Sequence, residues 1–406
     1  MRILIINAVY KIRSTGRTYY ELSNYARENG YECLVVYGNQ LGNYDNTIFM
    51  GNKIDHKLHA LKSRITGKAG CFSRFHTRKL LKFIKQYNPD IVHLGNLHGN
   101  FINVPMLLNF LGENNIATAL TLHDCFFFTG YCTHYTLNKC YKWKQGCEQC
   151  AFVEKNTSWF FDKSKFLWEI KKQTFNGIQN LGVIGVSDWI TNESKQSPVF
   201  KKAKVIKRIY NWVDLDVFKP IQSDVREELK IKDKIVLGAM ASKWDDTKGL
   251  DKIIKLSRRI EEKYVILLIG KVDKNVELSN NIIHIDFVEN VTELAKLYTQ
   301  MDLFLQFSMQ ETFGKVVAES LACGTPVLAL NSTASPELVE DGCGQVLGEN
   351  DSIEDIYNTI EQITEKGKEF YCLNCRKRAE EMFSKDKNLQ EYLETYRYLI
   401  ENKSVN

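Results

Sequence analysis

The chain has 406 residues, of which 44% are hydrophobic, so it is long enough for two domains that each bury a core. No apolar run approaches the roughly 18 to 20 residues needed to cross a bilayer. Residues 1–7 are expected to form a first strand rather than a signal peptide. The eleven irregularly spaced cysteines need no disulfide framework. Together these features predict a cytoplasmic protein.

Positive charge is concentrated near the N-terminus. The net charge is +5, yet residues 53–85 alone hold ten Lys and Arg against one Asp. Such a patch could lie on anionic lipid headgroups, so that the protein would be peripheral on the inner face of the membrane. A solvated helix face explains the charge equally well. A nucleic-acid partner is not expected, because no nucleic-acid-binding motif accompanies the charge.

The first half of the chain alternates short apolar runs with helical patterns, which is typical of a parallel sheet. Strands are predicted at 2–8, 31–37, 91–94, 116–122 and 182–187, the last of these closing the first domain. Helices are predicted at 18–29 and 101–114, with residues 14–17 as the first loop. His123 and Asp124 follow the fourth strand. A histidine at a strand end is a functional candidate, although a lone histidine is more often structural.

Four cysteines stand in the segment 129–150, at Cys132, Cys140, Cys147 and Cys150. Their spacing, C-x7-C-x6-C-x2-C, would let four thiolates close a tetrahedral structural zinc site in a loop with little core of its own. Buried free thiols are an equally weighted alternative, because only one half of the pattern has the tight C-x2-C turn.

The second half repeats the alternation of strand and helix. Strands are predicted at 234–241, 264–269, 281–285, 302–307 and 326–330, and helices at 250–262, 291–300, 353–366 and 388–401. The predicted fold class is therefore α/β with two Rossmann-like domains. We place the first domain at 1–200, the second at 205–380 and a C-terminal helix at 381–406.

Two carboxylates flank the turn between the strands 302–307 and 326–330. Glu311 falls on the loop, and Glu319 lies eight residues later inside the next helix. A loop at the carboxyl end of a parallel strand is where open α/β sheets bind ligands, and the helix start suits a phosphate. Carboxylates would repel a phosphate, but they accept hydrogen bonds from sugar hydroxyls. The pattern predicts a nucleotide-sugar site.

The segment from Glu311 to Glu319, with Ala322-Cys-Gly-Thr-Pro-Val327 after it, resembles the E-x7-E signature of retaining GT-B glycosyltransferases, in particular glycosyltransferase family 4. Residues 211–220 resemble the crossover between GT-B domains. The cysteine spacing resembles an insert of some polysaccharide-building members. The resemblance implies two domains facing across a cleft, the last helix returning to the first domain, and transfer of a sugar with retained configuration.

The resemblance also implies roles for individual residues. Glu311 would hold sugar hydroxyls with the backbone around Phe313 and Gly314, and Glu319 would accept from the ribose. Lys243 and Lys248 would bind the diphosphate, where Lys248-Gly249 matches the family pattern and Lys243 stands where the family has Arg. His123 would face the donor sugar. The remaining donor contacts implied are Gly16, Lys315 and Val316.

No dedicated nucleophile and no Asp-x-Asp at a pocket-facing strand end are evident, which predicts transfer without a metal cofactor. The partners expected are a nucleotide-sugar donor and a glycan or lipid-linked glycan acceptor, as in capsule, lipopolysaccharide or exopolysaccharide assembly. Two alternatives remain open: an epimerase or phosphorylase on the same fold, and a non-catalytic nucleotide-sugar-binding protein.

Overall fold

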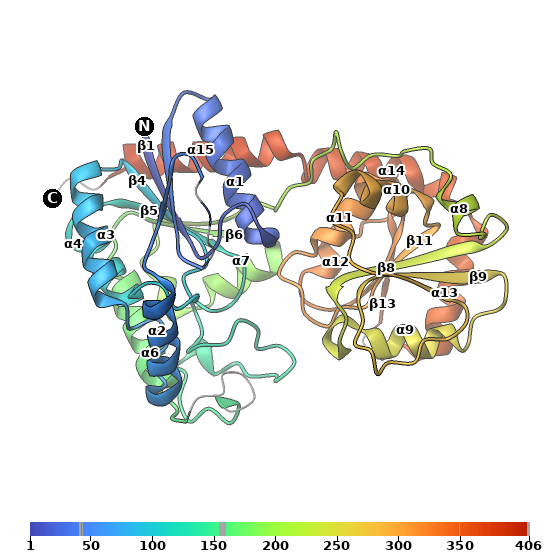
Figure 1. Ribbon diagram of the computed structural model, residues 1–406, viewed down its shortest axis with the longest axis horizontal. Coiled ribbons are helices and arrows are strands. Elements are labelled where there is room, and N and C mark those ends of the chain that lie inside the picture. The colour runs from blue at the N-terminus through green and yellow to red at the C-terminus, as the bar shows by residue number, and fades with distance from the viewer. Residues whose placement is uncertain (40–41, 43, 154–159, 349, 404–406) are drawn as a thin grey trace. The chain divides into compact units, whose positions relative to one another are not determined.

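The computed structural model describes residues 1–39, 42, 44–153, 160–348 and 350–403. Its contacts divide the chain into two compact units, each built on one parallel β-sheet with helices packed on it (Figure 1). Unit 1 comprises Met1–Ile209 with Leu389–Asn406, and unit 2 comprises Tyr210–Asn388. The predicted α/β class with two Rossmann-like domains is confirmed.

The sheet of unit 1 has seven strands in the order β3-β2-β1-β4-β5-β6-β7, and every neighbouring pair is parallel. Its central strands are continuous apolar runs, as expected where helices cover both faces. The strands are β1 (Arg2–Asn7), β2 (Glu32–Tyr37), β3 (Thr47–Phe49), β4 (Ile91–Leu94), β5 (Ala117–Leu122), β6 (Leu181–Gly185) and β7 (Val205–Arg208).

The helices of unit 1 lie in the connections between the strands of this sheet. They are α1 (Arg13–Glu28), α2 (Lys53–Thr66), α3 (Arg74–Tyr87), α4 (Val104–Glu113), α6 (Ser164–Phe175) and α7 (Asp188–Lys195), with short 3₁₀ turns η1 (Lys142–Lys144) and η2 (Pro198–Phe200). Between β5 and α6, η1 is the one element whose full extent lies within the described residues. That long connection holds the four-cysteine segment.

The sheet of unit 2 has six strands in the order β10-β9-β8-β11-β12-β13, again all parallel. The strands are β8 (Ile235–Lys243), β9 (Tyr264–Lys271), β10 (Ile282–Ile285), β11 (Leu303–Gln306), β12 (Val327–Leu330) and β13 (Gly344–Leu347). The direction of strand order reverses between β8 and β11. Open α/β sheets bind ligands at such a switch point, beyond the carboxyl ends of the strands.

Helices α10, α11 and α14 cover one face of this second sheet, and α9 and α13 cover the other (Figure 1). The helical elements are α8 (Val225–Glu228), η3 (Asp246–Lys248), α9 (Leu250–Ser257), α10 (Val291–Gln300), α11 (Lys315–Ala322), α12 (Ser335–Leu338), α13 (Ile353–Glu365) and α14 (Lys368–Met382).

The last helix, α15 (Lys385–Glu401), belongs to unit 1 from Leu389 onward. Tyr396 and Tyr392 are buried on its inner face. The Tyr396 hydroxyl lies 2.5 Å from Nδ1 of His93 in β4, and Thr121 in β5 donates to the Tyr392 hydroxyl at 3.2 Å. The prediction that the C-terminal helix returns to the N-terminal domain is confirmed.

Two predictions about unit 1 were wrong. Strand 182–187 is not the last of its sheet, because β7 follows it. β7 has the half-buried sequence Val-Ile-Lys-Arg, which resembles a linker because the strand lies at the sheet edge. Residues 14–17, predicted as a loop, lie in the first turns of α1. The buried face of α1, through Tyr19, Leu22 and Ala26, extends back to Gly16 at helical spacing.

Candidate functional site

The loops after β8 and β11 bring together two of the residues singled out in the sequence. These strands are direct neighbours at the switch point of the sheet, with Leu303 opposite Leu237 and Phe304 opposite Gly238. Beyond their ends, Lys248 Nζ donates to Glu311 Oε1 at 2.6 Å and lies 3.4 Å from Ser308 Oγ. The two side chains keep 35% and 20% of their surface exposed, so both remain reachable from solvent.

The local sequence explains why Lys248 is held at this point. Asp245 caps η3 by accepting from the Lys248 amide, and Gly249 follows with φ +81°. A Cβ on Gly249 would stand 2.4 Å from the Phe307 carbonyl oxygen, so only glycine lets the two loops approach this closely. The Met309 amide then joins the loops by donating to Thr247 O at 2.8 Å.

Glu311 is fixed from the other side. Its amide donates to Thr333 Oγ1 at 2.8 Å, and its carbonyl accepts from the Ala334 amide at 3.2 Å. A carboxylate held by its own backbone and touched by one lysine keeps acceptor capacity for a ligand's hydroxyl groups. Lys248 and Glu311 therefore form a charged pair that presents a cation and a hydrogen-bond acceptor side by side.

Glu319 lies on α11, with only 7% of its surface exposed. Its Oε2 accepts from the Tyr298 hydroxyl of α10 at 3.1 Å. A buried carboxylate needs such donors, and this one fixes the direction of the side chain. Gly314 begins α11 with φ +89°, and Lys315 and Val316 form its first turn, where backbone amides have no intrahelical acceptor.

The two remaining predicted residues of unit 2 differ in setting. The Phe313 ring is buried against Tyr210 and Phe383, with centroids 5.9 and 5.6 Å away, so only its backbone is available to a ligand. Lys243 ends β8, and its ammonium pairs with Asp273 at 3.2 Å where both side chains are more than 60% exposed. Lys243 thus lies in a looser, more solvated setting than Lys248.

Gln306 was missed in the sequence, where it reads as part of the apolar run 302–307. It ends β11 and is buried, and within the described residues its Nε2 has no hydrogen-bond partner. The atom lies beside Gly314, 3.8 Å from the place a Cβ would occupy. A buried amide without a partner is costly, so a bound ligand is a natural acceptor for it. The only sequence signal is a polar residue closing an apolar strand.

In unit 1, His123 follows β5 and its Nε2 lies 3.1 Å from the Tyr19 hydroxyl. Burial lowers the pKa of His123 to about 4, so the ring is neutral near pH 7. Asp124 accepts from His98 Nε2 at 2.8 Å and from the Phe126 amide at 2.9 Å. His98 was not singled out in the sequence, and it follows β4, next to β5 in the sheet.

Opposing effects set the charge of the His98–Asp124 pair. Burial lowers the pKa of His98, but the hydrogen bond and charge of Asp124 outweigh it and raise the pKa overall. For Asp124 burial raises the pKa, and His98 with the Phe126 amide lowers it below the ordinary value. Gly16, in the first turns of α1, packs on the loop after β1: its carbonyl accepts from the Lys11 amide at 2.9 Å, and a Cβ there would stand 3.2 Å from that nitrogen.

Sequence comparison assigns both halves of the chain. Residues 15–217 match the model of "Glycosyltransferase Family 4", and residues 221–382 match "Glycosyl transferases group 1". The chain belongs to glycosyltransferase family 4. This glycosyltransferase is 22% identical over 320 residues to WcaC of Escherichia coli K12, named as a colanic acid biosynthesis glycosyl transferase, covering 77% of each chain.

Another relative and two solved structures agree with this assignment. N-acetyl-alpha-D-glucosaminyl L-malate synthase of Bacillus anthracis is 26% identical over 179 residues, 41% of this chain and 46% of that one. Sucrose-phosphate synthase of Thermosynechococcus elongatus has a TM-score of 0.70 at 16% identity, covering 98% and 99% of the two chains. HepE of Anabaena, solved with UDP and glucose, has a TM-score of 0.66 at 17% identity, covering 98% and 100%. These structures confirm the GT-B fold.

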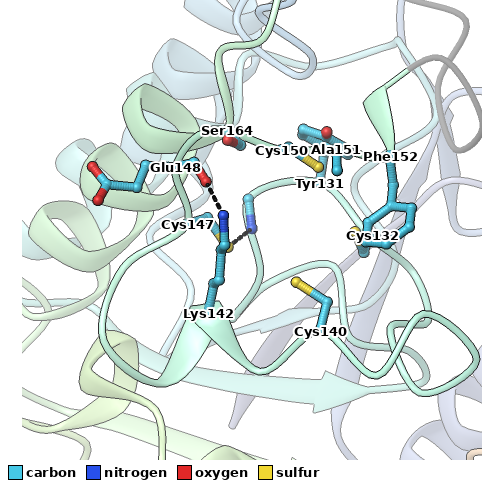
Figure 2. Close-up of a pocket in the computed structure, with 11 residues that line it drawn as sticks. Tyr131, Cys132, Cys140, Lys142, Cys147, Glu148, Cys150, Ala151, Phe152 and Ser164 are labelled. Carbon is cyan, nitrogen blue, oxygen red and sulfur yellow. Dashed lines mark hydrogen bonds between the residues drawn. The ribbon is translucent and has the colours of Figure 1, made fainter.

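The four cysteines of segment 129–150 line one pocket in unit 1, as Figure 2 shows. The volume of this pocket is about 70 Å³. Cys132, Cys140, Cys147 and Cys150 come from different turns of the connection between β5 and α6, and the Gly130 amide donates to Cys147 Sγ at 3.1 Å. None of them forms a disulfide. Within the described residues, no three His, Cys, Asp or Glu side chains already stand in a metal-binding arrangement.

In the described part of the chain, no helix is both long and apolar enough to cross a bilayer.

Proposed function

We propose that this glycosyltransferase transfers a sugar from a nucleoside diphosphate sugar to a hydroxyl group of a glycan, with retention of anomeric configuration and without a divalent metal ion in catalysis. The observation that carries the proposal is the 2.6 Å contact between Lys248 Nζ and Glu311 Oε1 beyond adjacent strand ends. A cation and a carboxylate side by side match a donor that joins a diphosphate to a polyol.

The proposed roles follow from the chemistry of each group. Lys248 binds the diphosphate. Its ammonium stabilises the negative charge that develops on the diphosphate as the bond between the phosphate oxygen and the anomeric carbon breaks. Glu311 then accepts hydrogen bonds from sugar hydroxyls, and Gln306 adds a donor. The first turn of α11, from Gly314, supplies amides for the phosphate. Glu319, directed by Tyr298, accepts from the ribose hydroxyls.

Lys243 and His123 have supporting roles in this proposal. Lys243 adds positive charge for the diphosphate from an exposed position at the end of β8. His123 contacts the donor sugar as a neutral hydrogen-bonding group, because its pKa of about 4 leaves it uncharged at neutral pH. Backbone groups near Gly16 contact the donor. These assignments rest on the family resemblance, together with the position of Lys243 and His123 at strand ends.

Retention needs the new bond to form on the face that the diphosphate leaves. In the proposed step the bond between the anomeric carbon and the phosphate oxygen breaks, and the acceptor oxygen bonds to the same carbon. The acceptor's proton passes to the departing phosphate, so no carboxylate nucleophile is required. Lysine supplies the positive charge that a metal ion provides in other transferases.

The name of WcaC supports a glycan acceptor, and the ligands of HepE support a nucleotide-sugar donor. WcaC is named for colanic acid biosynthesis, and HepE was solved with UDP, with UDP and glucose, and with UDP-glucose. We therefore propose that the acceptor is a lipid-linked glycan in capsule, lipopolysaccharide or exopolysaccharide assembly, reached at the inner face of the membrane.

A two-stage experiment tests the proposal. Thermal denaturation with UDP-, GDP- and ADP-sugars identifies the donor, since a ligand at 100 times its Kd stabilises the folded state by about 2.7 kcal/mol. The selected donor is then incubated with lipid-linked and free oligosaccharides, with and without EDTA, and the linkage is assigned by NMR. An inverted product, or turnover that EDTA abolishes and Mg²⁺ restores, would contradict the mechanism.

A further inference from the structure

Helix α2 has its apolar side exposed and its polar side buried. Ile54, Leu58, Leu61 and Ile65 are 72, 47, 53 and 48% exposed, and their spacing of four, three and four residues places them on one stripe. His59 and Ser63, on the opposite side, are only 1 and 3% exposed. A surface helix normally does the reverse.

A hydrogen-bonded network fixes this orientation. Ser73, at the start of α3, donates to Asp55 Oδ2 at 2.6 Å, so the contact of 2.9 Å between His59 Nδ1 and Ser73 Oγ has the imidazole as donor. Asp55 is held further by Asn52, which accepts from its amide. Rotating α2 to bury the stripe would break these hydrogen bonds, and no other bonds would replace them. The apolar stripe is therefore a fixed feature of the surface.

Basic side chains flank the stripe on both sides. At 100° per residue, Lys57, Arg64 and Lys53 lie along one edge and Lys62 along the other, and all four are exposed. Acidic residues are nearly missing here, since residues 53–85 contain one Asp and ten Lys and Arg. This combination is typical of helices that lie in the interface of an anionic bilayer.

Exposed aromatic rings extend the surface. The Phe160 amide donates to the carbonyl of Arg64 at 3.2 Å, and the Arg64 guanidinium lies 5.7 Å from the Phe160 ring centroid. Phe160 and Phe161 are 69 and 58% exposed. On α3, Phe75 is 61% exposed with Lys79 over its ring at 4.6 Å.

We propose that α2, with Phe160 and Phe161, inserts shallowly into the headgroup region of an anionic membrane. A second copy of the chain does not fit, because apposing two such faces would bring their lysines and arginines together. The inference deepens the proposed function, since it gives the element by which an enzyme acting on a lipid-linked acceptor reaches its substrate.

Flotation of the full-length protein with phosphatidylcholine vesicles, alone or mixed with phosphatidylglycerol, tests this inference. We expect binding to the anionic vesicles only, weakened by high salt. Replacing Ile54, Leu58, Leu61 and Ile65 together by Ser should lower partitioning about tenfold or more, because each removes apolar area that the bilayer would cover. Replacing Lys53, Lys57, Lys62 and Arg64 by Gln should abolish the preference for anionic lipid.

The matched control is Leu373→Ser on α14, where the leucine is 81% exposed. It should bind vesicles like the wild type. Equal melting temperatures would show that the serine variant is folded. Unchanged turnover on a soluble acceptor, with lost turnover on vesicles, separates this inference from the proposed function. The inference is overturned if the wild type does not bind vesicles, or if the serine variant binds them fully. It is also overturned if the wild type self-associates without lipid and the serine variant does not.

A separate observation concerns the four-cysteine pocket. Four thiols line a space of about 70 Å³ in the connection between β5 and α6, and Cys132 and Cys150 pack against the small cluster of Tyr131, Val153 and Leu167. A cavity needs about 10–15 Å³ of such space to hold one water molecule, so the pocket has room for an ion. The Gly130 amide donates to Cys147 Sγ at 3.1 Å, which holds that side chain at the pocket.

We infer that Cys132, Cys140, Cys147 and Cys150 bind one zinc ion, which fixes this connection. Binding requires the side chains to turn inward from the pocket walls, and the thiols release their protons as the ion enters. Metal analysis of protein purified without chelator should give one zinc per chain. Cys140→Ser and Cys147→Ser should lose it, and Cys372→Ser, on α14, should keep it.

If the serine variants fail to fold, Co²⁺ exchanged into the wild type should give the thiolate absorption of a tetrahedral site. Wild-type protein that stays metal-free after reduction and incubation with zinc, or variants that retain full zinc content, would overturn the inference.

Discussion

The charged pair of Lys248 and Glu311 gives the sharpest test of the donor site. In Lys248→Ala, the diphosphate loses the cation that takes up its charge, while the folded protein loses one partly exposed ion pair. The expected loss of catalytic rate is much larger than the expected loss of folding stability.

The stability term is small. The pair is 35% and 20% exposed, and ion pairs near the surface contribute about 0.2–1 kcal/mol. For a domain of this size 1 kcal/mol corresponds to about 2–4 °C in Tm. The catalytic term is larger, because removing one group that stabilises developing negative charge costs about 10²–10³ in kcat. We therefore expect a Tm within a few degrees of wild type and a loss of turnover of two to three orders of magnitude.

The assay measures kcat and KM for the donor, with Tm recorded on the same preparations. Lys255→Ala is the matched control, since Lys255 forms an exposed pair with Asp251 on α9 of the same unit. The control should leave turnover unchanged. Lys248→Ala protein that turns over donor within a few-fold of wild type would refute the assigned site. A drop in activity that tracks a large drop in Tm would show that the pair serves folding instead.

Three further predictions follow from individual contacts. Glu319→Ala should weaken nucleotide binding about 10- to 150-fold, as expected for loss of a hydrogen bond to a charged group, whereas Tyr298→Phe should keep most affinity; calorimetry with the free nucleotide decides. The His98–Asp124 pair should stabilise the fold fully between the ordinary pKa values of 3.8 and 6.5, since the Asp124 pKa is lowered and the His98 pKa is raised. Its stabilisation should fade as pH rises through the folded His98 pKa or falls through that of Asp124, and His98→Gln should flatten a plot of Tm against pH. Lys243→Ala should reduce turnover less than Lys248→Ala, because the Lys243 side chain is 61% exposed, and equal losses would contradict that ranking.

The sequence allowed the fold to be predicted where apolar runs are long and buried on both faces. β4 and α10 were predicted at their observed bounds, and in the structure Asn290 caps the start of α10. The edge strands β3, β7 and β13 were missed, since they are short and half exposed, so that their patterns resemble those of loops. Tertiary pairing, not local preference, makes them strands.

Among the functional residues, too, those marked by local sequence were predicted and those that depend on tertiary contacts were not. Glu311 and Lys248 were found because each follows a predicted strand at a known motif spacing, and their contact depends on β8 and β11 being neighbours, which local patterns alone do not fix. Gln306 and His98 were not predicted, because the contacts that mark them as candidates are with residues from other segments: Gly314 for Gln306 and Asp124 for His98. For α2 the charge was visible in the sequence, but which side of the helix faces outward depends on Ser73 and Asp55 meeting across 18 positions.

The buried tyrosines of α15 have a practical consequence for dissecting the enzyme. Since Tyr392 and Tyr396 complete the interior of the first sheet by bonding to Thr121 and His93, a fragment ending at Ile209 would leave those groups facing water. An isolated N-terminal half should therefore be insoluble unless the tail peptide is supplied alongside it. Circular permutation that joins the tail to Met1 would be the sounder route to producing it.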